Sequence, residues 1–340
     1  MPNNRKGDHL RIAAKKNINF HRSTLWENVN LVHKAVPEVD LESINFSTEF
    51  LGKKLHAPLM VVGMTGGVPA AEKVNKNLAA ICQKYGLAFG VGSQRPALTK
   101  ASLARTYRVR DVAPDVLLIA NLGLAQFCKR YGIAEAKRAI EMIDADAIAI
   151  HLNPAQEAIQ QEGDTNWVGG LKAIEKISSK FPVVAKETGC GVSRKVAQRL
   201  IDVGVKAIDV GGAGGTSWVA VESYRNSGIK HKASLTYWDW GIPTAASVMM
   251  TSGLGVPIIA TGGMKTGLDA AKAIASGATI AGFGMTAYAA QAKGAASLEE
   301  QVKAIIFELR LAMFLVGARN LQELTDSEKV ITGELKDWIK

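Results

Sequence analysis

Cysteine is scarce: the 340-residue chain contains only Cys82, Cys128 and Cys190. An odd number of widely spaced cysteines predicts neither a disulfide framework nor a zinc ribbon, and is typical of a protein in a reducing cytosol. Long hydrophobic runs are missing as well, since none reaches the roughly 18 residues of a membrane span without interruption by Gly or charge. The first ten residues, "MPNNRKGDHL", are polar. We therefore expect no signal peptide, no membrane partner and a cytoplasmic location.

Basic runs interleaved with aromatic residues are absent too, although the net charge is +10. This pattern does not indicate nucleic-acid binding. It leaves two explanations, a solvated basic surface or attraction to a small phosphorylated ligand. Linkers, low-complexity tracts and repeats are not visible either, so we predict a single domain over residues 1–340.

Short apolar runs ending in Gly or polar residues recur eight times. They are continuous rather than alternating, as in parallel strands buried on both faces, and amphipathic stretches separate them. This alternation predicts a (β/α)8 TIM barrel with strands from about 58 to 285, an N-terminal extension over residues 1–56 and C-terminal helices. A doubly wound open sheet is the alternative. The runs begin at Pro58, Leu87, Asp115, Asp146, Phe181, Lys206, Val256 and Ala278.

Two segments stand outside this alternation. In the extension, "FSTEFLGKKLHAP" predicts a hairpin that plugs or flanks the bottom of the barrel. Between the runs that begin at Lys206 and Val256, a long segment is rich in Trp, Tyr and charged residues. We expect it to be an extended loop over the barrel mouth, acting as a lid or a subunit contact.

Polar residues and glycines gather where the eight runs end. In a barrel these ends share one face, where active sites are built. "GGAGGTSW" and "ATGGMKTG" place glycines before helical segments, which favours a phosphate site over simple turns because backbone N–H groups and a helix N-terminus attract anions. In "HLNPAQE", Glu157 is a candidate Mg²⁺ ligand, completed by water and a diphosphate. His151 alone would be weak support for a site, but it stands beside Asn153 and Gln156.

Lys186 ends an apolar run, where a buried ammonium needs a reason. It either pairs with a structural carboxylate or stabilises an anionic cofactor such as reduced flavin. Arg5, Lys6 and His9 lie in a basic segment before the barrel. That segment is either a disordered tail or an arm that clamps a diphosphate together with Arg95.

These motifs together resemble type 2 isopentenyl diphosphate isomerase, the FMN-dependent form, in the right order and over essentially the whole chain. The combination of "HLNPAQE", "GSQR" and "NRKGDHL" carries most of the resemblance. It implies interconversion of isopentenyl and dimethylallyl diphosphate in isoprenoid biosynthesis, with reduced FMN as the acid–base catalyst, NADPH or NADH as reductant and Mg²⁺ on the diphosphate. It also implies a homo-oligomer, a tetramer or octamer.

The resemblance assigns residues as well. It implies catalytic roles for Gln156, Lys186 and His151 acting with N5 of reduced FMN, and a metal-binding role for Glu157. It implies substrate contacts from Arg5, Lys6, His9, Ser93, Gln94, Arg95, His151, Asn153 and Gln156. It implies FMN contacts from Met64, Thr65, Gly66, Ser93, Asn121, Lys186, Thr216, Gly262, Gly263, Met264, Lys265, Gly284 and Met285.

Three other functions compete with this prediction. A hydroxy-acid oxidase of the FMN barrel group would need His and Arg after the sixth strand, where this chain has "GGAGGTSW". IMP dehydrogenase would need a nucleophilic Cys there, whereas the nearest cysteine, Cys190, follows the fifth strand. A non-catalytic phospholigand-binding barrel would need neither flavin nor a metal-binding carboxylate.

Overall fold

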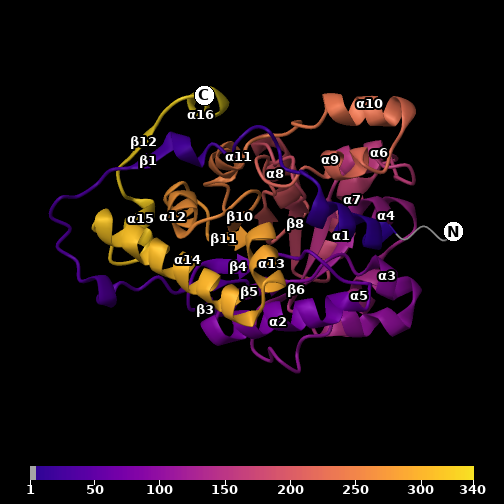
Figure 1. The fold of residues 1–340 in the computed structure, drawn as a ribbon, viewed down its shortest axis with the longest axis horizontal. Coiled ribbons are helices and arrows are strands. Elements are labelled where there is room, and N and C mark those ends of the chain that lie inside the picture. Colours follow the sequence, from indigo (N-terminus) through magenta and orange to yellow (C-terminus); the bar gives the residue numbers. More distant parts are fainter. Residues whose placement is uncertain (1–4) are drawn as a thin grey trace.

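The structure, a computed structural model, describes residues 5–340, apart from the side chains of Arg5, Lys6, Leu10, Ala13 and Ala14. Within these residues, parallel strands close into an eight-stranded barrel, in the order β10-β11-β4-β5-β6-β7-β8-β9 (Figure 1). The predicted barrel is confirmed, and the open sheet is excluded. The barrel strands are β4 (Leu59–Val61), β5 (Ala88–Gly90), β6 (Leu118–Gly123), β7 (Ala147–Leu152), β8 (Val183–Glu187), β9 (Ala207–Asp209), β10 (Ile258–Ala260) and β11 (Ile280–Phe283).

Each barrel strand buries both of its faces, which is why the apolar runs are continuous. Side chains such as Met60, Ile119 and Val184 fill the inside of the barrel. Their chain neighbours, such as Val61 and Val183, belong to the larger cluster between the strands and the outer helices. Because side chains alternate along a strand, this pattern decides which polar residue points inward at the end of each strand.

A ring of helices surrounds the barrel. Several end as their sequences predict: α2, for example, closes on Gly86, which has the left-handed backbone that glycine favours at a C-cap. The helices that follow the barrel strands are α2 (Ala70–Tyr85), α3 (Arg95–Thr99), α4 (Leu124–Lys129), α5 (Ile133–Ile143), α6 (Pro154–Ile159), α7 (Gly170–Ser178), α8 (Arg194–Asp202), α11 (Thr244–Thr251), α12 (Gly267–Ala275) and α13 (Met285–Ala292).

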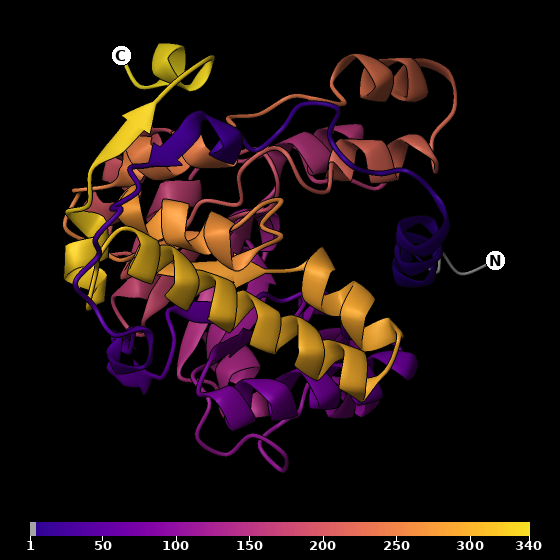
Figure 2. The same ribbon diagram turned by 60° about the vertical axis from the view of Figure 1, so that its left-hand side comes forward.

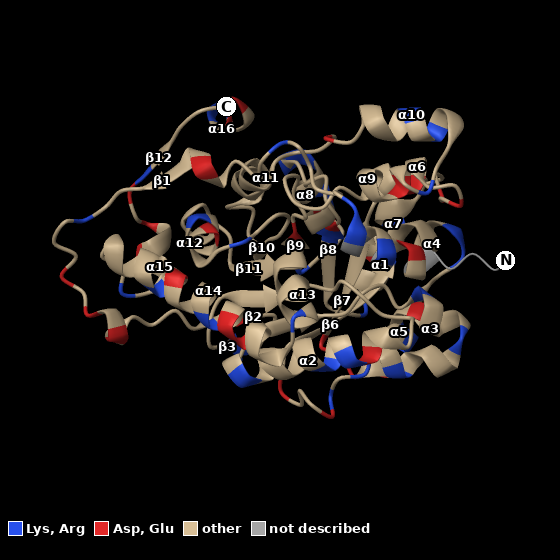
Figure 3. Ribbon diagram, in the orientation of Figure 1, with Lys and Arg blue, Asp and Glu red and all other residues tan. Residues whose placement is uncertain are grey.

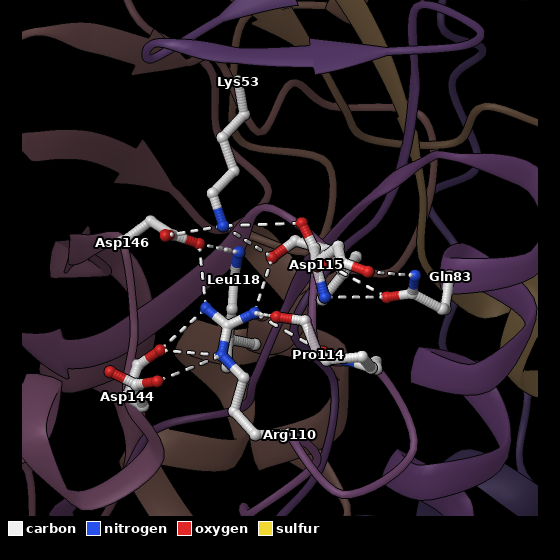
Figure 4. A network of polar contacts seen from close by, with 10 residues as sticks. Lys53, Gln83, Arg110, Pro114, Asp115, Leu118, Asp144 and Asp146 are labelled. Carbon is white, nitrogen blue, oxygen red and sulfur yellow. Dashed lines mark hydrogen bonds and ion pairs between the residues drawn. The ribbon is translucent and has the colours of Figure 1, made fainter.

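The bottom of the barrel is closed by the predicted hairpin, β2 (Thr48–Phe50) and β3 (Lys53–Leu55). Phe50 and Leu55 are buried in the cluster that fills the barrel interior. From the same hairpin, Lys53 forms an ion pair of 2.7 Å with Asp146 (Figure 4). Asp146 also binds Arg110 at 3.0 Å and accepts the backbone N–H of Leu118. The plug is therefore held by apolar contact and by charge.

The prediction of an extended loop over residues 211–257 is wrong, because the segment contains three helices. These are α9 (Trp218–Ser223), α10 (Gly228–Thr236) and α11. Helix α11 is the barrel helix that precedes β10, while α9 and α10 are additional. The sequence "TAASVMMT" of α11 gave no amphipathic signal, since even its polar residues Thr244, Ser247 and Thr251 are buried.

The two ends of the chain are joined outside the barrel. Strand β1 (Val29–Leu31) pairs antiparallel with β12 (Lys329–Ile331). The C-terminal part holds the long helix α14 (Ala295–Leu315), in agreement with the expected helices, followed by two short ones, α15 (Leu321–Thr325) and α16 (Leu335–Trp338). The short 3-10 helices are η1 (Trp26–Asn28), η2 (Leu41–Ser43) and η3 (Ala101–Thr106).

Helix α1 (Arg5–Lys15) lies beside α9 (Figures 1 and 2). The strap that follows it, residues 16–24, is fixed to the loop after β9 by backbone hydrogen bonds, including Phe20 N–H to Gly215 O at 2.9 Å and Ser217 N–H to Ile18 O at 2.8 Å. Charged residues of both signs are interspersed over the outer helices (Figure 3). Among residues 5–340, no helix is both long and apolar enough to cross a membrane.

Candidate active site

A cavity of about 860 Å³ opens at the carboxyl ends of the barrel strands. The barrel forms its floor and one side. Residues 17–23 of the strap and helix α9 contribute to its wall. A cavity of this size fits a cofactor and a small substrate together, because ligand sites typically measure about 300–1,000 Å³. Its position is the face on which barrels carry their active sites.

The structure brings most of the predicted site residues to this cavity. Every predicted FMN contact lines it, and so does the proposed metal ligand Glu157. The predicted substrate contacts that line it are His9, Ser93, Arg95, His151, Asn153 and Gln156. The side chains of Arg5 and Lys6 lie outside the described residues.

Gln94 is not brought to the cavity, contrary to our prediction. Its side chain is fully buried, donating to Ala139 O of α5 at 2.8 Å and accepting from Asn121 N–H at 2.9 Å. Ser93 and Arg95, on either side of it, line the cavity. Gln94 therefore braces β6 against α5, and its side chain is turned away from the cavity.

Lys186 and Asp209 form an ion pair on the floor of the barrel mouth. They lie side by side on β8 and β9, and Lys186 Nζ is 2.8 Å from Asp209 Oδ2. Thr261, which follows β10, donates its hydroxyl to Asp209 Oδ1, as does Gly211 N–H at 3.2 Å. The pairing with a carboxylate was one of the two explanations for a Lys at this strand end. The second remains compatible, because Lys186 also lines the large cavity.

Asn121 fixes the orientation of His151 from the neighbouring strand. Asn121 donates through Nδ2 to Val91 O at 3.0 Å, so its Oδ1 is the atom 2.8 Å from His151 Nδ1. A carbonyl oxygen only accepts, so Nδ1 carries the proton. The ring packs against Gly123, where an added Cβ would lie 2.6 Å from His151 Nε2. The imidazole is therefore held in one orientation and one tautomer.

The short helix α6 carries three polar side chains that bind one another. Asn153, at its N-cap, donates through Nδ2 to Gln156 at 3.0 Å and to Glu157 Oε1 at 3.2 Å. Glu157 Oε2 accepts from Gln160 Nε2 and from Asp164 N–H, both at 2.7 Å. Pro154, at the first position of the helix, suits this turn because its missing N–H would have no partner there.

Glu222 is a residue that sequence analysis missed. Its fully buried carboxylate accepts from His9 Nε2 at 2.8 Å, from Gln156 Nε2 at 3.2 Å and from Arg225 Nη1 at 2.6 Å. Burial raises the pKa of Glu222, but these hydrogen bonds and charges outweigh burial and hold the pKa below its usual value. The signal for it was slight, a single acid in an otherwise apolar turn of α9 that no motif includes.

Glu187 faces the opposite side of β8 from Lys186, away from the cavity. It accepts backbone N–H groups of Gly189, at 2.6 Å, and of Cys190. Burial raises the pKa of Glu187 to about 7, although these hydrogen bonds and the charge of Lys186 act in the opposite direction. This carboxyl group shapes the loop after β8.

The two glycine-rich loops after β9 and β10 pack backbone against backbone. A Cβ on Gly262, whose φ is +103°, would lie 2.1 Å from Gly212 O, and one on Gly215 would lie 2.4 Å from Gly263 N. No other residue type fits at such approaches. These loops line the cavity together with Gly284, which precedes α13, so glycine backbone and the N-terminus of a helix lie at the cavity.

Comparison with known proteins agrees with this architecture. A family model described as FMN-dependent dehydrogenase matches residues 104–331. Among solved structures, a lactate oxidase from Pediococcus acidilactici superposes with a TM-score of 0.66 at 17% identity, covering 91% of this chain and 84% of that one. A mandelate oxidase variant gives 0.65 at 15% identity, covering 96% of each chain. At such identities the likeness shows the fold alone.

The family match, over more than half of the chain, places the protein in the FMN-dependent dehydrogenase family. A protein from Thermococcus onnurineus named isopentenyl-diphosphate delta-isomerase is 47% identical over 350 residues, which cover 99% of this chain and 93% of that protein. One of the same name from Archaeoglobus fulgidus is 45% identical over 339 residues, covering 98% and 97%. The chain belongs to the isopentenyl-diphosphate delta-isomerase family, as the motifs indicated.

Proposed function

We propose that this protein interconverts isopentenyl diphosphate and dimethylallyl diphosphate with FMN as its cofactor. The observation that carries the proposal is identity of 43–47% over nearly the whole chain to proteins named for this activity. The geometry supports it, since the residues of "HLNPAQE" converge with a glycine-lined cradle on one cavity.

The chain's own residues fit FMN. Gly214, Gly215, Gly262 and Gly263 line the cavity without side chains, so the backbone there could approach a phosphate closely. Lys186 supplies a positive charge on the barrel floor and lines the same cavity. When bound and reduced, FMN supplies the acid–base chemistry of the reaction. Met64, Thr65, Ser93 and Asn121 line the same cavity as Lys186 and the glycine loops.

The diphosphate would lie among the basic and amide groups opposite. His151 is held ready by Asn121, and Arg95 and His9 line the same cavity. Arg5 and Lys6 belong to the same proposed set, at the start of α1. Gln156, with its amide held by Asn153 and Glu222, would face the alkene. Trp218 lines the cavity 5.4 Å from the ring of His9, where its face could stabilise positive charge that develops on carbon.

Glu157 suits Mg²⁺. Residues 5–340 contain no cluster of three or more His, Cys, Asp or Glu side chains that could hold a metal without substrate. A single carboxylate is nevertheless what Mg²⁺ often takes from a protein when phosphates and water complete its shell. Beside Glu157, two buried oxygens, Asn153 Oδ1 and Gln160 Oε1, have no hydrogen-bond partner among the described residues. This excess of acceptors over donors supports a cation at this place.

Three further properties belong to the proposal. NADPH or NADH would reduce the flavin, the protein would act in the cytoplasm, and the chain would assemble into a homo-oligomer, a tetramer or octamer. We further propose that residues 1–340 form one domain, because the β1–β12 pairing joins both ends of the chain to the same body.

The test is a spectrum and an assay on the same sample. Purified protein with FMN should show the absorbance of bound flavin, and after anaerobic reduction it should convert either diphosphate to an equilibrium mixture followed by NMR. Oxidised enzyme should be inactive. Oxidation of lactate or mandelate without isomerisation would assign the protein to the oxidase group instead, and failure to bind FMN would favour a phospholigand-binding barrel.

A further inference from the structure

We propose that Asp209 is a positioning residue and counter-ion for Lys186, and that it sets how strongly the protein favours reduced over oxidised FMN. The inference rests on the proposed binding of FMN. It concerns a residue that touches neither cavity ligand directly and that acts through its neighbour.

The geometry separates the two residues clearly. Lys186 lines the 860 Å³ cavity and also a small cavity of about 20 Å³ inside the barrel, below it. Asp209 lines only the small cavity. Their side chains are 15% and 3% exposed. Asp209 therefore lies below Lys186, away from the large cavity. It influences the cavity by partly offsetting the positive charge of the Lys186 ammonium group.

The carboxylate of Asp209 is itself fixed. Its Oδ1 accepts from the Thr261 hydroxyl and from Gly211 N–H, which leaves Oδ2 for Lys186. The ammonium group then donates to Glu187 O at 3.3 Å, and with these two bonds made its third N–H can point into the cavity. A lysine tail has many rotamers, and such anchoring is what holds one of them.

Stability alone does not explain this pair. A buried ion pair contributes little net stability, because desolvation offsets most of the attraction. The interior beneath it is filled by apolar side chains such as Ala207 and Ile259. What an ion pair provides and an apolar pair does not is an oriented charge. Toward the cavity it presents the positive end of a dipole, weaker than an isolated ammonium group.

A flavin above Lys186 would feel this difference when it gains charge on reduction. Asp209→Asn keeps the shape and an acceptor oxygen for Lys186 but removes the negative charge. We expect reduced FMN to bind at least tenfold more tightly relative to oxidised FMN than in wild type. For a two-electron couple this is a rise of about 30 mV in midpoint potential. Affinity for oxidised FMN, followed by fluorescence quenching, should change less than the potential.

A double-mutant cycle shows whether the effect passes through Lys186. In Lys186→Met no ammonium group remains for Asp209 to offset. Adding Asp209→Asn to this variant should therefore change the midpoint potential by less than a third of the change it causes in wild type. An equal shift in both backgrounds, or an unchanged or lowered potential in Asp209→Asn, overturns the proposal. Asp146→Asn is the matched control, since it removes a carboxylate from an ion pair at the opposite end of the same barrel and should leave the potential unchanged.

A second variant tests the proposal if Asp209→Asn does not fold. Thr261→Val leaves both charges but removes one donor from the carboxylate, so Asp209 should offset Lys186 more strongly and the preference for reduced FMN should fall at least threefold. An unchanged preference again overturns the proposal. If wild type binds no FMN, it is the proposed function that fails, and if wild type binds FMN while these variants match it, only the role of Asp209 fails.

Discussion

His9 and Glu222 are joined by a hydrogen bond of 2.8 Å although 213 residues separate them in the chain. This bond connects helix α1, which precedes the barrel, to helix α9 in the insertion after β9. The same carboxylate holds Gln156 at 3.2 Å. One buried acid therefore sets the position of two residues proposed to meet the substrate, which come from helices α1 and α6.

Glu222→Gln should raise KM for the diphosphate by roughly 10- to 100-fold, because a hydrogen bond to a charged group is worth about 1.5–3 kcal/mol. FMN affinity should stay within a few-fold of wild type, since Glu222 does not line the flavin end. Steady-state kinetics and flavin titration measure the two effects. Deleting residues 1–10, which removes His9 altogether, should raise KM at least as much.

The control for Glu222 lies on the same helix as His9. Asp8→Asn breaks an exposed ion pair with Arg11, and such pairs contribute little. Its kinetics should match wild type. An unchanged KM in both Glu222→Gln and the truncated protein would contradict the proposed contact of α1 with the diphosphate. Helix α1 would then have only a structural role.

Glu157→Gln should leave the fold intact but raise the Mg²⁺ concentration needed for half-maximal activity by at least about tenfold, given that even outer-shell changes around a metal typically cost that much. The amide keeps an acceptor for Gln160 and Asp164 but loses the charge that would attract the cation. A Mg²⁺ titration of activity, with melting temperature as a check on folding, measures this. Glu141→Gln, at an exposed position, is the control. Wild-type Mg²⁺ dependence in Glu157→Gln would rule out the ligand role.

Lys186→Met should weaken binding of reduced FMN by roughly 10- to 100-fold, corresponding to the 1.5–3 kcal/mol of a charge-assisted contact. Oxidised FMN carries less charge at its ring, so its affinity should fall less, and the midpoint potential should drop. Anaerobic redox titration with reference dyes gives the potential directly. A potential equal to that of wild type would show that Lys186 is only a structural partner of Asp209.

Glu187 should make the protein less stable as pH rises from about 4.5 to about 7. Its folded pKa of about 7 lies above the ordinary value of 4.5, so the unfolded chain loses this proton at lower pH than the folded protein does. The stabilising effect of the neutral acid is complete below about pH 4.5 and disappears as pH approaches 7. It amounts to about 3 kcal/mol over that window.

The test for Glu187 compares melting temperatures across pH. Between pH 5 and pH 8, Glu187→Gln should lose less stability than wild type, because the amide does not titrate. Its stability at low pH will also differ from wild type, since an NH2 group replaces Oε1, while the amide oxygen can take the place of Oε2, which accepts both backbone N–H groups. The diagnostic quantity is therefore the slope with pH. Parallel profiles for the two proteins would show that Glu187 does not titrate in this range.

The eight strands, their order in the chain and the face that carries the chemistry were predictable from the sequence. Parallel strands covered on both sides must be apolar throughout, so each strand appears as a continuous run that stops where the barrel mouth begins. Lys186 could be placed at that mouth because an ammonium group at the end of such a run has nowhere else to reach solvent or a ligand. Gly262 was recognisable because a glycine cluster at the end of an apolar run indicates a backbone conformation or a close approach that only glycine allows.

Side chains that depend on contacts between distant segments were not predictable. Gln94 lies between two cavity residues in the motif, yet it faces α5, because consecutive residues leaving a strand point to different sides. Glu222 and Asp209 carry no local signal of their roles; each is defined by partners from other elements, His9 and Gln156 for one, Lys186 and Thr261 for the other. The sequence by itself determined the barrel, because burial acts on every residue of a strand. Only the tertiary structure decided which acids hold the site, because a hydrogen bond depends on the closure of the barrel bringing two atoms within about 3 Å.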